Sequence, residues 1–445
     1  MILGGQRMDV IKIKEYSAFR VCRNEEEHQG DSDGNNTILN VEPFTALEQF
    51  ILNCKNDKNE AIEVMNISAR RGIGKIITAK NYVGVITMTD GTTIEILPKI
   101  YSVGHQDEEE QSKKILIQML RTLYNMPSIT LQSTNLDIEK MPLFEIFIRM
   151  FIDEVLKITR SGLKSSYETL EENVTFFKGK LKFAEHIRKN FIHRERNYIS
   201  YDAFTVNRPE NKVLKTALQF LYLHTRSSKN KTDIKNILAV FEDVDVSVDY
   251  KTDLAKIVPD RNTKGYSTAL EWAKVFLSGK SFTSFSGSET ALALLFPMDK
   301  LFECYIASLV KKEMAASNYK VSTQHTGYYL FDEPKKTFKI RPDIVIFNPK
   351  DSTDTFVFDT KWKILDKSSN NYGISQGDMY QMYVYQKKYV ANSVTLLYPL
   401  SHSVSHDEKI KYITEGGNVV VTVKFIYLLN AKEEVNKILC DVLNS

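Results

Sequence analysis

One stretch of the sequence, Lys339–Lys363 (KIRPDIVIFNPKDSTDTFVFDTKWK), constrains the fold more than any other. Its pattern indicates two strands rich in apolar residues, joined by a segment dense in turn-forming residues, Asn348–Asp354. Folding this hairpin about its midpoint, Asp351, places Asp343 opposite Asp359, with the two side chains about 5 Å apart on one face. The sequence therefore predicts a β-hairpin that brings two carboxylates together.

Two ionised carboxylates this close together are stable only if a positive charge lies between them. Like charges directly opposite each other on a sheet are destabilising. A divalent metal with oxygen ligands would relieve the repulsion between Asp343 and Asp359. Lys361 lies on the same face two residues beyond Asp359, where it could hold a water molecule or an anionic phosphate. This combination is the chemistry of a metal-dependent nuclease.

Each aspartate has a simpler reading when it is taken alone, because a solvated aspartate beside a turn is common. The joint pattern favours a functional site. Asp343 follows Pro342 at the start of a strand, where proline is tolerated. Asp359 ends the apolar run Phe356–Phe358, where an unpaired charge is costly. We therefore interpret the two aspartates as a catalytic pair.

Composition and charge bound what the whole chain can do. Its 445 residues suffice for about three domains of roughly 150 residues each. The net charge of +3 is low for a protein that holds DNA unaided, so either the basic surface is local or another subunit supplies most of the DNA affinity.

The four cysteines are scattered without a C-x-x-C pair, which suits a reducing cytoplasm. No apolar run reaches the roughly 18 residues of a membrane span and no secretory signal is visible, so we expect a cytoplasmic protein without membrane contact.

Patterns along the chain predict a multidomain α/β protein in three parts. Residues 1–135 are β-rich and contain a hairpin signal at Asp90-Gly91. Residues 136–268 are predicted to be mainly helical, forming a linker or DNA-contacting region. Residues 269–445 alternate helices with strands, which favours a mixed sheet carrying the Lys339–Lys363 hairpin.

Two predicted helices flank this hairpin. Asp299 could cap the first helix, and Glu303 lies beside the buried face of that helix. On the second helix, predicted over residues 378–389, Gln381 and Tyr385 are i, i+4 neighbours. Glu303 could also be an ordinary surface glutamate, and Gln381 with Tyr385 an ordinary packing pair.

Two basic clusters lie outside the hairpin. The first is either a solvated turn or a contact surface for a partner or a phosphate, since it lacks the spacing of a phosphate-binding loop. The second is either a solvated helix surface or a track for DNA phosphates. The first consists of Arg70, Arg71, Lys75 and Lys80, and the second of Lys178, Lys180, Lys182, Arg188 and Lys189, with Arg194 and Arg196 nearby.

The hairpin motif, Pro342-Asp343…Asp359-Thr360-Lys361, resembles that of the P-D…(D/E)-x-K nuclease superfamily. More narrowly, the chain resembles the McrC family, the nuclease subunit of McrBC-type modification-dependent restriction systems. The resemblance covers most of the chain from about residue 60 onward. Besides the motif and the hairpin within Gly74–Lys99, the matching stretches are FFKGKLKFAEHIRKN (Phe176–Asn190), FTVNRPENKVLKTAL (Phe204–Leu218) and PMDKLFECYI (Pro297–Ile306).

The resemblance implies a restriction-endonuclease-like domain at the C-terminal end and a role for each motif residue. Asp343 and Asp359 would ligate Mg²⁺, or Mn²⁺ in its place, with Glu303 as an outer ligand. Lys361 would position the attacking water and stabilise the transition state. Double-stranded DNA would be cleaved to leave a 5′-phosphate.

The resemblance also implies supports and partners. Gln381 and Tyr385 match the Q-x-x-x-Y element of the RecB-like nucleases, which implies that they support the site or touch DNA. A McrB-like AAA+ GTPase hexamer would recognise and translocate modified DNA in a prokaryotic cytoplasm. The N-terminal part would dock on that hexamer and stimulate its GTP hydrolysis, since the chain has no nucleotide-binding motif of its own. The alternatives are a stand-alone RecB-like DNA nuclease and a non-catalytic adaptor that activates a GTPase.

Overall fold

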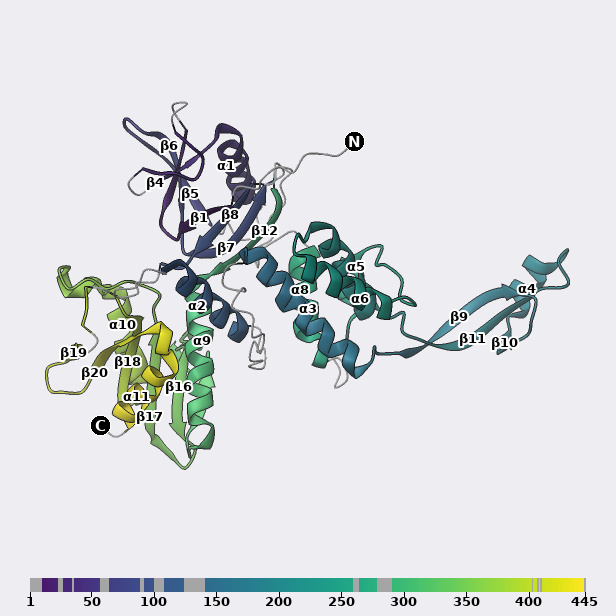
Figure 1. The fold of residues 1–445 in the computed structure, drawn as a ribbon. Helices are drawn as coiled ribbons and strands as arrows, with labels where there is room; N and C mark the ends of the chain where they lie inside the picture. The colour runs from purple at the N-terminus through teal and green to yellow at the C-terminus, as the bar shows by residue number, and fades with distance from the viewer. Residues whose placement is uncertain are drawn as a thin grey trace. The chain divides into compact units, whose positions relative to one another are not determined.

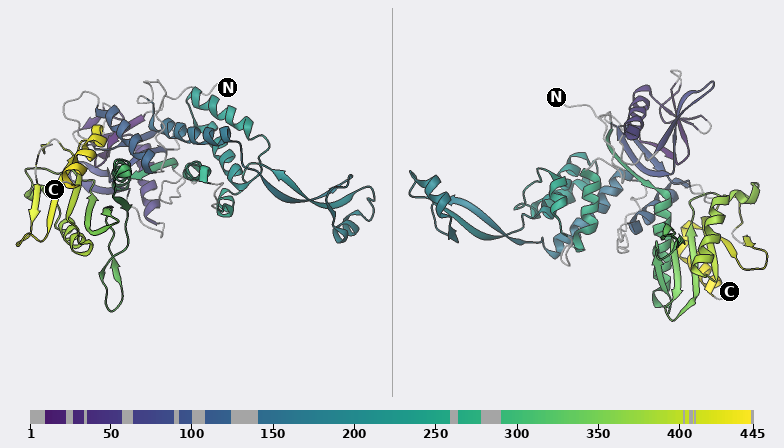
Figure 2. Two further views of the ribbon diagram at one scale, coloured as in Figure 1. Left: turned by 90° about the horizontal axis from the view of Figure 1, so that it is seen from below. Right: turned by 180° about the vertical axis from the view of Figure 1, so that it is seen from behind.

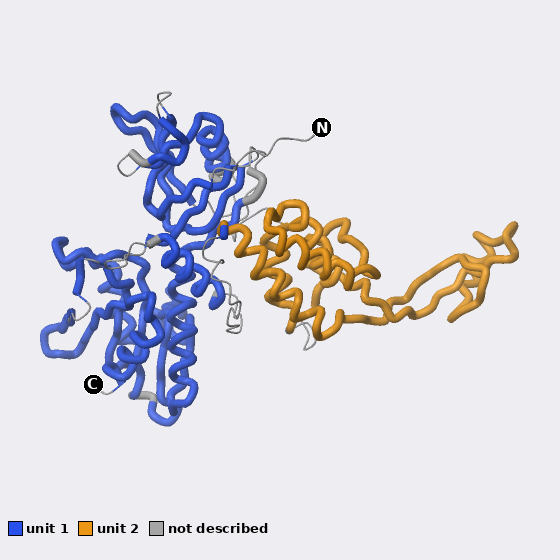
Figure 3. The backbone as a smooth tube through the Cα atoms, in the orientation of Figure 1, with its two compact units in different colours: residues 1–141, 281–445 blue, residues 142–280 orange. Residues whose placement is uncertain are grey.

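The structure is a computed structural model that describes residues 10–22, 27–33, 36–56, 64–88, 92–99, 108–123, 141–258, 264–277, 290–401, 403–405, 408 and 410–443. These residues form helices and several sheets, which confirms the predicted α/β class (Figure 1). The chain divides into two compact units, residues 1–141 with 281–445, and residues 142–280 (Figure 3). The division into parts 1–135, 136–268 and 269–445 stays a prediction.

The first unit begins with a five-stranded sheet in the order β3-β4-β2-β6-β5. Helix α1 (Val41–Asn56) covers it, because Phe44 and Leu47 of the helix are buried in one core with Phe19 of β2. The strands are β2 (Ala18–Val21), β3 (Ser32–Asp33), β4 (Asn36–Leu39), β5 (Met65–Arg70) and β6 (Gly74–Ala79).

A four-stranded sheet in the order β1-β8-β7-β12 shares that core. Strand β12 comes from the last part of the sequence and pairs with β7 so closely that a Cβ on Gly84 would lie 1.9 Å from the backbone O of Leu294. The sheet is therefore built from two parts of the chain that lie far apart in the sequence. Its strands are β1 (Val10–Lys14), β7 (Tyr82–Met88), β8 (Thr93–Leu97) and β12 (Thr290–Pro297). Helix α2 (Glu108–Leu123) joins it through a buried ion pair of Lys113 with Glu95, 3.0 Å between Nζ and Oε2.

The rest of the first unit is a mixed six-stranded sheet in the order β13-β16-β17-β18-β20-β19. The β17–β18 and β18–β20 pairs are parallel and the others antiparallel, as the alternation of helices and strands predicted. Its strands are β13 (Lys320–Thr323), β16 (Ile344–Asn348), β17 (Asp351–Thr360), β18 (Ser393–Pro399), β19 (Ile410–Ile413) and β20 (Val420–Ile426). A separate hairpin joins β14 (Tyr329–Phe331) to β15 (Thr337–Lys339). The helices are α9 (Met298–Glu313), α10 (Gln376–Tyr389) and α11 (Ala431–Leu443), with 3₁₀ turns η2 (Met314–Ala316), η3 (Asn370–Gly373) and η4 (Leu428–Asn430).

The second unit has a helical part held by an internal carboxylate. Glu145 of α3 is buried, and its carboxylate accepts hydrogen bonds from Thr225 Oγ1, Arg226 N and Asn230 Nδ2 at 2.7–2.8 Å. These bonds tie α3 to the start of α6. The helices are α3 (Leu143–Ser161), α5 (Pro209–His224), α6 (Ser228–Val240), α7 (Tyr250–Lys256) and α8 (Ser267–Leu277), with η1 (Lys264–Tyr266) before α8. No helix within the described ranges is long and apolar enough to cross a membrane.

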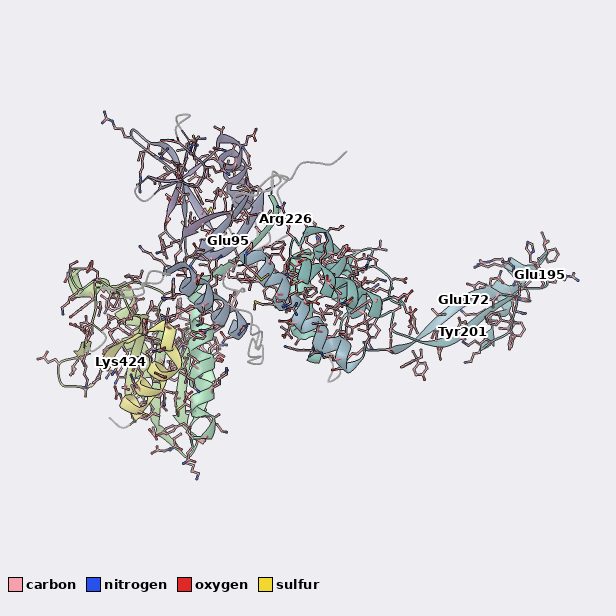
Figure 4. All side chains as sticks on the ribbon, in the orientation of Figure 1. Glu95, Glu172, Glu195, Tyr201, Arg226 and Lys424 are labelled. Atoms are coloured by element: carbon pink, nitrogen blue, oxygen red, sulfur yellow. The ribbon has the colours of Figure 1, made fainter. Side chains whose placement is uncertain are left out.

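A β-arm extends from the helices of the second unit (Figure 2), although residues 136–268 were predicted to be mainly helical. Strands β9 (Ser166–Val174) and β11 (Asn197–Thr205) pair antiparallel along their whole length, with β10 (Lys180–Leu181) and α4 (Phe183–Asn190) at the far end. The prediction missed these strands because their side chains are mostly polar on both faces. Cross-strand contacts replace a core: Tyr201 OH donates to Glu172 Oε2 at 2.9 Å (Figure 4).

Candidate active site

The two aspartates of the predicted hairpin lie together at one end of β16 and β17. The strands pair Ile344 with Phe358, and one further step in the same register puts Asp343 opposite Asp359. Both line a pocket of about 380 Å³. The other lining residues are Asp299, Glu303, Thr360, Lys361, Trp362, Lys363, Asp378 and Gln381. The fold thus gathers five carboxyl groups and two lysines around one pocket.

The surroundings of Asp343 and Asp359 disfavour the ionised forms of these two carboxyl groups. Asp343 Oδ2 accepts hydrogen bonds from Thr360 N at 2.8 Å and Thr360 Oγ1 at 2.7 Å, which fix its orientation. Asp359 is 2% exposed, and this burial together with the charge of Asp343 raises its pKa to about 7. Burial and the charge of Glu303 also raise the pKa of Asp343. The repulsion expected from the opposed pair is therefore present.

Lys361 provides the nearest positive charge. Its Nζ lies 2.8 Å from Asp359 Oδ2 and 3.7 Å from Asp378 Oδ1. Burial alone would lower the pKa of Lys361, but the neighbouring carboxylates, Asp359 foremost, outweigh burial and raise it. Lys361 therefore stays protonated at neutral pH, as a group that binds phosphate or orients water must.

Helix α10 holds this lysine in place. Lys361 Nζ donates to Gln381 Oε1 at 3.0 Å, and Gln381 Nε2 donates to the hydroxyl of Tyr385. Tyr385 is buried and donates in turn to the backbone O of Arg341 at 2.9 Å. The structure thus brings Gln381 and Tyr385 together with Lys361, and their supporting role stays a prediction.

Gln324 is a site residue that the sequence did not reveal. Its Nε2 donates to Glu303 Oε1 at 2.6 Å and lies 3.3 Å from Asp343 Oδ1, so one amide bridges the two carboxylates. Gln324 has a φ of 51°, which is unusual for a residue other than glycine. It directly follows β13, whose pairing with β16 was not evident from the residues, and no motif marks it.

The donor set of the pocket fits a hard divalent cation. Asp343, Asp359 and Glu303 offer carboxylate oxygens, the ligands that Mg²⁺ prefers, and a cation would offset the repulsion in the aspartate pair. Within the described ranges, no three acidic, histidine or cysteine side chains converge closely enough to form a complete metal site. Gln324 instead donates to Glu303 and Asp343. The binding of Mg²⁺ or Mn²⁺ stays a prediction.

The sheet at the start of the chain contacts the pocket directly. The Trp362 ring packs on Phe302, with 5.3 Å between ring centroids, and Trp362 Nε1 donates to Glu15 Oε1 at 2.8 Å. Glu15 is buried, also accepts from Lys99 N at 2.8 Å, and has its pKa raised to about 7, chiefly by burial. Trp362 and Glu15, which the sequence did not single out, therefore link the β1-β8-β7-β12 sheet to the pocket.

Asp299 differs from its predicted role. Pro297 is the N-cap residue of α9, and no side chain caps this helix end. Asp299 lies in the first turn instead, where its Oδ1 accepts a hydrogen bond from Asn81 Nδ2 at the start of β7. Asp299 adds a carboxyl group to the pocket, and burial raises its pKa because it disfavours the ionised form.

Replacing Trp362 with Phe is expected to lower the free energy of unfolding at pH 8 by about 1–3 kcal/mol. The phenyl ring still packs on Phe302, but the ionised carboxylate of Glu15 loses one of its hydrogen bonds. The pKa of Glu15 is about 7 in the folded chain and 4.5 ordinarily, so Glu15 is protonated in the folded chain at pH 5. A neutral carboxyl depends less on its donors, and the cost should shrink there.

Chemical unfolding of the full chain at the two pH values measures this effect. Glu15→Gln cannot ionise, so Trp362→Phe made in that background should cost the same at pH 5 and pH 8. An equal cost at both pH values in the wild-type background would contradict the proposed link between Trp362 and the Glu15 charge.

The two basic clusters do not line the pocket. Three residues of the first cluster, Arg70, Arg71 and Lys75, lie at the tip of the β5–β6 hairpin, and Lys80 follows β6. Lys75 Nζ pairs with Glu48 Oε1 at 2.7 Å.

The other cluster lies on the β-arm, where several of its lysines contact side chains of the arm itself. Lys178 Nζ lies 4.1 Å from the ring centroid of Tyr201, Lys189 Nζ lies 4.2 Å from that of Tyr198, and Lys182 pairs with Glu171 at 2.6 Å; Lys180 and Arg188 complete this cluster.

A solved structure shares this fold. A chain in "Refined half-complex from tetradecameric assembly of Thermococcus gammatolerans McrB AAA+ hexamers with bound McrC" matches with a TM-score of 0.67 and 17% identity, covering 98% of this chain and 100% of that chain. A chain in "Cryo-EM structure of the Thermococcus gammatolerans McrBC complex" has a TM-score of 0.48 and 18% identity, covering 69% of this chain and 88% of that chain. No curated protein matches the sequence.

A protein-family model gives the assignment. The model described as "McrBC 5-methylcytosine restriction system component" matches residues 77–399. That range is well over half of the chain and includes Asp343, Asp359 and Lys361. The chain therefore belongs to the McrBC family of restriction-system components.

Proposed function

We propose that this chain is the DNA-cleaving subunit of its restriction system, a Mg²⁺-dependent endonuclease. The observation that carries the proposal is the pocket in which Asp343 and Asp359 oppose each other beside Lys361. A structural ion pair would not need a second, half-buried carboxylate and an open cavity. Membership in the McrBC family supports the same reading.

Asp343 and Asp359 would bind the cation, and Glu303 would be an outer ligand. Mn²⁺ could replace Mg²⁺. When bound, such a cation lowers the pKa of a water molecule and offsets negative charge on a phosphate. The protonated Lys361 orients the attacking water and stabilises charge on the phosphate oxygens in the transition state. Water adds to phosphorus as the P–O3′ bond breaks, leaving a 5′-phosphate and a 3′-hydroxyl. Gln381 keeps Lys361 Nζ directed toward the pocket.

We further propose that the chain works with a McrB-like AAA+ GTPase hexamer and stimulates its GTP hydrolysis. The fold shared with a chain of an assembly of "McrB AAA+ hexamers with bound McrC" supports this partner. Arg70, Arg71, Lys75 and Lys80 are candidate contacts to it. Lys178, Lys180, Lys182, Arg188 and Lys189 stay proposed contacts to double-stranded DNA, although their pairing within the β-arm weakens that assignment.

The test combines the purified chain, methylated plasmid DNA and Mg²⁺, with and without the AAA+ GTPase of the same system and GTP. We expect cleavage only in the complete mixture, because the low net charge leaves DNA delivery to the partner. Robust cleavage by the chain alone would favour a stand-alone RecB-like nuclease. GTPase stimulation without cleavage would favour a non-catalytic adaptor.

A further inference from the structure

A second cavity, of about 430 Å³, lies next to the active-site pocket. Gln381 lines both. The cavity is bounded by the β14–β15 hairpin, the segment leading into β16, and α10. Its volume falls in the range of about 300–1,000 Å³ that is usual for small-ligand sites, and the proposed reaction does not use it.

Aromatic rings form much of this cavity. Phe338 is 72% exposed and Tyr380 is 63% exposed, and both line it together with the buried Tyr385. Phe338 has a φ of 56°, a strained backbone conformation for a bulky residue. Such strain is retained mainly at functional sites. The two exposed rings therefore are positioned to contact a ligand in the cavity and do not pack in the core.

The cavity is joined to the catalytic lysine by a chain of hydrogen bonds. Lys361 Nζ donates to Gln381 Oε1, and Gln381 donates to Tyr385, which donates to the backbone O of Arg341. One side chain thus separates the two sites. Because Gln381 lines both cavities, a nucleotide next to a phosphate bound at Lys361 would lie beside the second cavity.

The charge at the rim suits a nucleic acid strand. Lys339 and Arg341 line the cavity and are exposed, where they can contact backbone phosphates. Exposed aromatic rings beside basic groups are how single-stranded nucleic acids are commonly bound, because every base has a face that can stack. Such stacking is tolerant of sequence.

We propose that this cavity receives a nucleobase from a nucleotide next to the phosphate that is cut, unstacked from the duplex and held against Phe338 and Tyr380. The inference rests on the proposed nuclease function and extends it to how the cleaved DNA strand is bound. It predicts a preference for DNA with an unpaired base, independent of the identity of that base.

The test measures binding of the full chain to fluorescent oligonucleotides at low ionic strength, where a weakly basic protein also binds DNA. A chelator is present so that no cleavage occurs. Three duplexes differ at one place: fully paired, with an unpaired nucleotide, and with an abasic site at the unpaired position. We expect the unpaired nucleotide to improve affinity about tenfold and the abasic site to remove that gain. Phe338→Ala and Tyr380→Ala should each reduce the preference, and Phe338→Trp should keep it.

Phe204→Ala is the matched control, since Phe204 is 67% exposed but lies on β11 in the other unit, outside the Lys178–Lys189 cluster. It should bind like wild type. Equal affinity for the three duplexes, no binding to any of them, or an unchanged preference in both Phe338→Ala and Tyr380→Ala would overturn the inference. Cleavage by the complete system is scored separately, so a wild-type chain that cleaves DNA but shows no preference for the unpaired base rejects the cavity proposal and leaves the nuclease function standing.

Discussion

Replacing Asp359 with Asn is expected to abolish DNA cleavage and, above pH 7, to stabilise the folded chain. Both effects follow from the buried charge. Asp359 ionises near pH 7 in the folded chain and near 3.8 ordinarily, so the folded chain binds more protons between these pH values. Its stability therefore falls as pH rises from about 4 to 7 and stays low above 7. Asparagine does not ionise and avoids this loss, which is on the order of 4 kcal/mol.

Urea unfolding of the two proteins at pH 4.5 and pH 8, in chelator, measures the stability effect. The advantage of Asp359→Asn should be small at pH 4.5 and largest at pH 8. Asp354→Asn is a matched control on the same strand, since Asp354 accepts from Tyr319 OH at 2.8 Å and lies outside the pocket. It should keep cleavage and show no such advantage. An Asp359→Asn chain that is less stable than wild type at pH 8 would contradict a destabilising carboxylate pair.

Replacing Lys361 with Met is expected to reduce cleavage by about 10²–10³-fold and to destabilise the fold. The sign on stability is opposite to that of Asp359→Asn, because the buried Asp359 loses its ion pair and keeps its charge penalty. At pH 8 we expect a loss of about 1–3 kcal/mol. Adding Asp359→Asn to Lys361→Met should recover most of this loss, since no buried charge is left unpaired.

Lys363→Met controls for the removal of a positive charge from the same pocket. Lys363 Nζ donates to the backbone O of Gly373 and is not paired with Asp359. Steady-state cleavage and urea unfolding of both variants give the two readouts. A Lys363→Met variant as impaired in cleavage as Lys361→Met would show that the pocket requires positive charge in general and not the lysine of the motif.

The hairpin was predictable because its register follows from local information. The turn formers between 348 and 354 fix its midpoint, and a strand period of two then decides which side chains share a face. The structure has Ile344 opposite Phe358, as folding about Asp351 requires. The turn itself is shorter than predicted: β17 already begins at Asp351, which pairs with Asn348 after a register shift that follows Phe347. The flanking helices were also predictable from periodicity, so Glu303 and Gln381 were placed on the right elements.

The features that were missed depend on contacts between residues far apart in the sequence. Gln324 reaches Asp343 only because β13 pairs with β16, and Glu15 meets Trp362 across 347 positions. Strand β12 joins a sheet made by the start of the chain, which no local pattern can indicate. The β-arm was missed for a different reason: strands with little burial on either face lack the apolar alternation that predicts a strand.

The most direct measurement is DNA cleavage by the Asp359→Asn chain assembled with its AAA+ GTPase and Mg²⁺, with GTP hydrolysis followed in the same reaction. The catalytic assignment predicts that cleavage is lost while GTP hydrolysis stays at the wild-type level, because Asp359 lies in the proposed nuclease pocket, which none of the proposed docking contacts lines. Cleavage at the wild-type rate by this variant would contradict it and leave the hairpin with a structural role.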